Sequence, residues 1–216
     1  MGLKLTDSNP NVTDLSDRHR PTKLAEKYAE LYDNQWTDAF DVLDKIFPSE
    51  EKIINILLNI LLDVMRFCKE KATEQMKLLT QHLQFTDTNI KGDNSTDFMK
   101  LVKDCRKAAA TTAMVNLKKI HQLYLTQSAN ETLKTALDVE AITSECLEVC
   151  WFMAVQDPPV AFAALLTNGS SFETELYKPY TISGTHVEYV VWPPLVLHEN
   201  GPILAKGIAQ GCGKKL

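Results

Sequence analysis

Apolar side chains recur every three to four residues through the first three quarters of the chain, the spacing of helices that bury one face. The pattern predicts five helices, over about 21–31, 34–47, 50–83, 96–127 and 131–156. Asp33-Asn34 separates the first two and can cap the second, and Asp157-Pro158-Pro159 ends the last because proline cannot continue a helix. Residues 1–20 lack the periodicity, so we expect a flexible N-terminal tail followed by a single domain over 21–216.

From residue 171 the pattern changes to short segments rich in β-branched and aromatic residues. We expect strands over 171–177, 185–192, 195–197 and 203–209, with a turn at Asn200-Gly201. The expected fold class is therefore mainly α: a helical bundle with long central helices and a small C-terminal antiparallel β element laid on it.

The segment IINILLNILL at 53–62 is apolar enough to suggest a membrane span, but Asp63 and Arg66 follow directly. The run is shorter than the ~20 apolar residues that a span needs. At about 100° per residue, one polar stripe follows the helix within an arc of roughly 80°. This stripe contains Asn55, Asn59, Asp63, Arg66, Glu70, Thr73 and Lys77. We expect a central helix of a bundle, wet along that stripe, with Leu57 and Leu61 buried and no transmembrane span.

On the helix predicted over 96–127, the apolar positions gather on one arc, which we expect to be buried. That arc contains Leu101, Val102, Cys105, Ala108, Ala109, Ala113, Ile120 and Leu123. Asn116 lies in the middle of the arc, so we expect it to be buried and hydrogen-bonded.

Basic residues gather on a different arc of the same helix, on the side away from the apolar one. This basic ridge consists of Lys100, Lys103, Lys107, Lys118 and His121, within roughly 60°. A solvated helix face explains it most simply. The functional interpretation is a docking surface for anionic lipid headgroups or an acidic partner. No large aromatic residue lies on the arc, so stacking on nucleic-acid bases is not expected.

Composition narrows the partners further. The chain has 216 residues and a net charge of −5, so no overall positive field attracts nucleic acid. Its five cysteines form no disulfide framework and sit mostly in helical, apolar contexts, which favours a reduced, cytosolic chain.

The sequence contains no motif for catalysis, a cofactor or a metal. Cys146 and Cys150 are one helical turn apart but have no histidine near them, so buried structural thiols are the better interpretation. His198-Glu199 could carry out acid–base chemistry, but the pair stands beside Asn200-Gly201, which favours a solvated turn. We therefore expect a protein that is not an enzyme and holds no cofactor.

Three segments are similar to those of a known family. Residues 191–210 read VWPPLVLHENGPILAKGIAQ, 31–40 read LYDNQWTDAF, and 150–159 read CWFMAVQDPP. In this order they resemble the C-terminal domain of the mitochondria-eating protein family, over residues of about 25 to 210. Each motif alone has little specificity, and the order gives them more.

The resemblance implies a role that the composition does not indicate. Family members act in mitochondrial quality control without a known enzymatic activity, they self-associate, and association with mitochondrial lipid such as cardiolipin is attributed to them. The resemblance thus implies an interaction module that contacts anionic phospholipid or a protein partner, or alternatively a self-association domain without membrane contact. A cytosolic chain that associates with mitochondria is the location it implies. The motif residues are aromatic anchors and turn formers, so no catalytic site is carried over.

Overall fold

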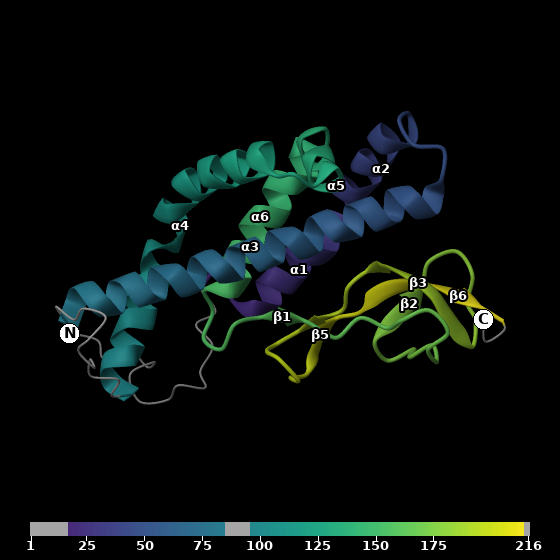
Figure 1. Ribbon diagram of the computed structural model, residues 1–216. Helices are drawn as coiled ribbons and strands as arrows, with labels where there is room; N and C mark the ends of the chain where they lie inside the picture. Colours follow the sequence, from purple (N-terminus) through teal and green to yellow (C-terminus); the bar gives the residue numbers. More distant parts are fainter. Residues whose placement is uncertain (1–16, 85–95, 214–216) are drawn as a thin grey trace.

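The structure is a computed structural model that describes residues 17–84 and 96–213. Helices make up the first part of the chain. They are α1 (Pro21–Leu31), α2 (Thr37–Asp44), α3 (Glu50–Gln84), α4 (Thr96–Gln127), the single turn α5 (Glu131–Lys134) and α6 (Glu140–Ala154). Figure 1 shows α3 as the long central helix. In this view α4 crosses α3 near one end and then runs above it, and the strands lie below the other half of α3.

The central helix α3 confirms its predicted orientation. Leu57 and Leu61 are each 1% exposed, while Asn59 and Arg66 face solvent. The buried residues of α3 are all apolar, and α6 packs along them. An apolar surface this wide must be covered by other elements, which leaves the polar stripe toward water.

The predicted helix bounds hold best where the helices are long. The predictions 50–83 and 96–127 match α3 and α4 closely. The predicted 131–156 helix is instead three pieces, α5, a 3₁₀ turn over Thr135–Leu137 and α6. The predicted break at Asp33-Asn34 is wrong, because a π-helical turn over Tyr32–Trp36 carries the chain from α1 into α2 without a side-chain cap.

The C-terminal part contains short strands arranged in two sheets. They are β1 (Ala161–Phe162), β2 (Tyr177–Pro179), β3 (His186–Trp192), β4 (Leu195–Val196), β5 (Ile203–Ala205) and β6 (Gly207–Cys212). The prediction of a strand over 171–177 is wrong, because this segment is mostly loop and turn and only its last residue begins a strand. One sheet has the order β1-β4-β5 and the other β2-β6-β3. All pairs are antiparallel except β2 with β6, which is parallel. The mainly α fold class with a small C-terminal sheet element is confirmed.

Aromatic contacts fix the sheets on the helices. The ring of Trp192, 2% exposed, stacks on that of Tyr28 in α1 with 4.9 Å between centroids. The Tyr28 hydroxyl also donates a hydrogen bond to the Pro193 carbonyl at 2.8 Å. Gly207 lets β6 approach the backbone of the same segment, because a Cβ at this position would lie 2.5 Å from the Trp192 carbonyl oxygen. The segment around Trp192 is therefore an ordered junction.

The chain ends are described only in part. Of the predicted N-terminal tail, residues 1–16 lie outside the described residues. Its remaining part contacts the helices: His19 stacks on Phe152 of α6 with 3.5 Å between ring centroids, and Asp17 pairs with Lys107 of α4. That residues 21–216 form a single domain stays a prediction.

Candidate functional site

The predicted site residues all lie on α4, but their environments differ. Lys100 and Lys118 are exposed, and neither forms an ion pair with another described residue. Lys103 pairs with Asp157 at 2.9 Å, and Lys107 pairs with Asp17 at 2.7 Å. Two of the four lysines are thus partly neutralised by carboxylates of this chain, so they attract an external anion less than Lys100 and Lys118 do.

His121 does not belong to this surface. It is 3% exposed and lies against the rings of Phe67, at 4.8 Å, and Tyr124, at 5.9 Å between centroids. Burial lowers the pKa of His121 to about 4, while the charge of Asp63 opposes the shift. The expectation that His121 shares an exposed arc is therefore wrong, because aromatic packing draws its ring into the core.

The orientation of α4 is the main difference from the sequence prediction. The helix turns toward the protein a face that includes two polar residues. These buried residues are Val102, Arg106, Ala110, Met114, Leu117, His121 and Leu125. At Ala110 the absence of a larger side chain lets α6 come close, and the indole Nε1 of Trp151 donates a hydrogen bond to the Ala110 carbonyl at 3.0 Å.

Much of the arc expected to be buried is consequently exposed. We define the outer face of α4 as Leu101, Cys105, Ala108, Thr112, Val115, Lys119 and Leu123, which fall within about 80° of arc. The exposed fractions are 68% for Leu101, 64% for Val115 and 58% for Leu123. Asn116 is exposed too, which contradicts its predicted burial. Singly exposed apolar residues are ordinary, but a row along one helix is typical of a contact surface.

A polar network ties α3 to the inward side of α4. Arg66 donates hydrogen bonds to Asp63 and to the Tyr124 hydroxyl, which in turn donates to Asp63 Oδ1 at 2.9 Å. Arg66 also pairs with Glu70 at 2.9 Å. Because Asp63 accepts both bonds, its carboxylate is held in place at the edge of the α3 polar stripe.

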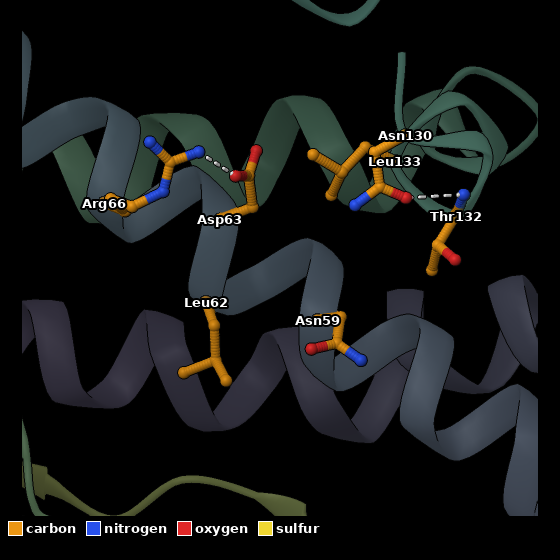
Figure 2. A pocket seen from close by; sticks show the side chains of 7 residues that line it. All are labelled: Asn59, Leu62, Asp63, Arg66, Asn130, Thr132 and Leu133. Carbon is orange, nitrogen blue, oxygen red and sulfur yellow. Dashed lines mark hydrogen bonds and ion pairs between the residues drawn. The ribbon is translucent and has the colours of Figure 1, made fainter. Parts of the chain in front are cut away.

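This network borders a cavity of about 380 Å³ between α3 and the turn that leads into α5. Figure 2 shows Arg66 turned toward Asp63 on one side and Asn130 toward Thr132 on the other. The Asn130 side chain caps α5 by accepting a hydrogen bond from the Thr132 amide at 3.0 Å. Most polar groups of the cavity lining are paired with a neighbour, whereas Asp63 Oδ2 has no hydrogen-bond partner among the described residues. The lining contains no cysteine, serine or histidine, so we assign the cavity a structural role.

Within residues 17–84 and 96–213, no three His, Cys, Asp or Glu side chains come together as a metal site would require. Cys146 and Cys150 are buried, and burial raises the pKa of both thiols, that of Cys146 to about 12. Neither is thus a thiolate near neutral pH. Over the same part of the chain, no helix is both long and apolar enough to cross a bilayer.

Sequence reasoning missed two functional candidates on α4, the outer face and Arg106. Four residues of the outer face, Leu101, Cys105, Ala108 and Leu123, belong to the arc that the sequence predicts to be buried, since periodicity alone does not say which side is covered. Arg106, 7% exposed, lies among the buried positions. Only its place in the series of buried positions at 102, 106, 110 and 114 could have indicated that it turns inward.

Comparison with known proteins places the chain in a family. The family model described as mitochondria-eating protein matches residues 20–211, nearly the whole chain. No curated protein matches, and no solved structure does. The match includes all three motif segments and every helix and strand described above, except the last residue of β6. The chain therefore belongs to the mitochondria-eating protein family, which implies a role in mitochondrial quality control and association with mitochondria.

Proposed function

We propose that this domain is a non-enzymatic interaction module of mitochondrial quality control that contacts anionic, cardiolipin-like lipid through the outer face of α4. The observation that carries the proposal is the row of exposed apolar side chains at Leu101, Val115 and Leu123. A helix that lies on a membrane surface buries such a row among the acyl chains and places lysines beside it.

Charge supports the lipid rather than a neutral partner. The α4 helix contains five Lys and one Arg against two Asp, Asp97 and Asp104, on a chain whose net charge is −5. Lys119 lies within the outer face, and Lys100 and Lys118 flank it. Each lysine close to an anionic bilayer contributes about 1 kcal/mol to binding. Lys100, Lys118 and Lys119 therefore attract an anionic bilayer without a contribution from Lys103 or Lys107, which are paired with Asp157 and Asp17.

Vesicle flotation tests the proposal. Wild-type protein should float with phosphatidylcholine vesicles that contain cardiolipin and remain behind with pure phosphatidylcholine. Replacing Leu101, Val115 and Leu123 with serine, or Lys100, Lys118 and Lys119 with glutamate, should abolish flotation while the circular-dichroism spectrum is unchanged. Lys134→Glu, on α5, is the matched control for charge reversal. Equal flotation of both triple variants and the wild type would contradict the proposal.

A probe on Cys105 locates the contact. This thiol is exposed on the outer face, whereas Cys68, Cys146 and Cys150 are buried. With Cys212 replaced by serine, an environment-sensitive fluorophore on Cys105 should shift to shorter wavelength when cardiolipin vesicles are added. Binding without a shift would mean that another surface touches the lipid.

Self-association through the same face is the second candidate. Leu101, Cys105, Ala108, Thr112 and Val115 follow each other at alternating spacings of four and three, the seam of paired helices. Sedimentation velocity separates self-association from lipid binding. Self-association would be favoured if the wild type is a dimer, the triple serine variant is a monomer, and the wild type does not float with cardiolipin vesicles.

A further inference from the structure

Arg106 is a buried positive charge with no carboxylate of the described residues bonded to it. Only 7% of its surface is exposed, and it forms no ion pair with any described Asp or Glu. Two of its five N–H groups donate to the carbonyls of Ala72 and Val155, both at 3.4 Å, and its Nε has no partner. Both bonds are at the long end of the range, and burial lowers the pKa of the guanidinium.

Such a group is unusual in a folded protein. A buried arginine is ordinarily paired, because an isolated charge loses its hydration without compensation. The contact with Val155, which follows α6, places the guanidinium at the carbonyl end of that helix and offsets part of this loss. The charge of Asp157, which pairs with Lys103, opposes the lowering of the Arg106 pKa, but no ion pair joins Asp157 to the guanidinium.

Arg106 lies in the wall of a cavity of about 680 Å³ between α3, the end of α6, β1 and the turn after β4. That volume is in the range of small-molecule sites. The lining combines polar and charged residues with a rigid apolar wall. The polar set is Lys69, Thr73, Arg106, His198 and Glu199, and the apolar set includes Pro158, Pro159 and Phe162. His198-Glu199 thus borders a cavity, where the sequence favoured a simple solvated turn.

The charges of the lining favour an anion. Lys69 and Arg106 outnumber the single carboxylate, that of Glu199, which is exposed. A planar guanidinium with free N–H groups suits the tetrahedral oxygens of phosphate, and a lysine adds a point charge. Glu199 can accept hydrogen bonds from hydroxyl groups next to the phosphate.

We propose that this cavity binds a phosphate monoester, with Arg106 and Lys69 on the phosphate and Glu199 beside its polyol portion. A soluble phosphate ester and a phosphatidate-type headgroup present the same chemistry. The site lies on the inward side of α4, away from the outer face, so it does not depend on the proposed function above.

Thermal unfolding with and without glycerol 3-phosphate, at constant ionic strength, tests the site. At saturation the wild type should melt at least about 4 °C higher with the ester than without it. Arg106→Met keeps an apolar stem of similar length but removes the charge, so its melting temperature should not respond. The matched control is Arg66→Met, because Arg66 is exposed and paired with Asp63 and Glu70. It should keep the full response.

Flotation with phosphatidylcholine vesicles containing phosphatidate identifies the source of the phosphate. If it is a lipid headgroup, Arg106→Met should reduce recovery as well as the melting response. If it is soluble, recovery stays unchanged and only the melting response is lost. The triple glutamate variant of α4 should keep the response to glycerol 3-phosphate even where it no longer floats, which separates this site from the outer face.

Two outcomes would overturn the proposal. One is an equal rise in melting temperature with glycerol 3-phosphate in the wild type and in Arg106→Met. The other is no rise in the wild type together with equal flotation of the wild type and Arg106→Met on phosphatidate vesicles. If Arg106→Met does not unfold cooperatively, Lys69→Met takes its place, because Lys69 is exposed at the cavity and its removal leaves the core intact. A full response in Lys69→Met would then count against the site.

Discussion

The two longest helices, α3 and α4, differ in how far their sequences specify their orientation. Both have the lengths that their periodicity predicts. In α3 the predicted polar stripe faces solvent, whereas α4 is turned so that much of its predicted core arc is exposed and two polar residues are buried. An accurate prediction of a helix is therefore not yet a prediction of its contacts.

The width of the apolar surface explains the difference. In α3 large apolar residues surround most of the circumference, and the buried set includes Ile53, Leu57 and Phe67. No other orientation covers so much apolar area. In α4 the apolar arc includes Ala108, Ala109 and Ala113, and each methyl group contributes little on burial. Rotation of α4 therefore changes the buried apolar area only slightly.

Specific contacts then decide the orientation of α4. The Trp151 indole reaches the Ala110 carbonyl, His121 packs on Phe67, and Arg106 reaches the carbonyl at the end of α6. None of these contacts has a local signal in the sequence. The comparison teaches that a mixed helix is oriented by its partners more than by its own periodicity.

The largest expected effect tests the buried side of α3. Leu57→Ala and Leu61→Ala should each destabilise the protein by about 2–5 kcal/mol, because each leaves a cavity in a packed core. Leu101→Ala and Leu123→Ala, on the outer face of α4, should change stability by less than about 0.5 kcal/mol. Urea unfolding measures both pairs. A loss at Leu101 as large as at Leu57 would show that α4 is oriented as the periodicity predicts.

The next effect concerns the buried polar side of α4 and depends on pH. His121 has a pKa of about 4 when folded and an ordinary value of 6.5, so the unfolded chain binds a proton more readily between these values. Stability should therefore fall as pH decreases from about 6.5 to about 4, by about 3 kcal/mol in total. His121→Phe keeps an aromatic ring and should remove this fall.

The control for this prediction is His186→Phe, which lies outside the helices in β3. It should leave the pH dependence of the melting temperature as in the wild type. If His121→Phe and the wild type lose stability in parallel over this range, then His121 is not held neutral in the core.

A smaller change in stability is expected when the same larger side chain is placed on either side of α4. Ala110 is 1% exposed beneath Trp151, so Ala110→Leu should force the helices apart and destabilise by about 1–3 kcal/mol. Ala108→Leu adds the same atoms on the exposed outer face and should be silent within about 0.5 kcal/mol. Thermal unfolding of the pair provides the comparison, and a reversed order would place Ala108 in the core.

In the rest of the molecule, too, the sequence predicts what a residue type requires but not which distant residues it contacts. Trp192 has a ring so large and apolar that burial is expected from its residue type alone, and the ring lies against Tyr28. The parallel pairing of β2 with β6 was not predictable, since the sequence of a short strand does not indicate which strand it pairs with. The basic ridge was found by charge, but Asp17 and Asp157, which neutralise two of its lysines, are distant in sequence.

The smallest expected change in stability is at Asn116, and its sign tells whether this residue is exposed or buried. Asn116 is exposed, so Asn116→Ala should stabilise the protein by about 0.5 kcal/mol through the higher helix propensity of alanine. If Asn116 were buried and hydrogen-bonded, as the periodicity predicts, the same change would destabilise by about 1–3 kcal/mol, because its partner would be left unsatisfied. Asn59→Ala on the exposed stripe of α3 should behave like Asn116→Ala, since its amide bonds only within its own helix, to the Asn55 carbonyl at 2.8 Å and to the Asn55 side chain. Equal small shifts in both variants, measured by urea unfolding, place Asn59 and Asn116 alike in solvent, whereas a clear loss at Asn116 alone would return the outer face of α4 to the core.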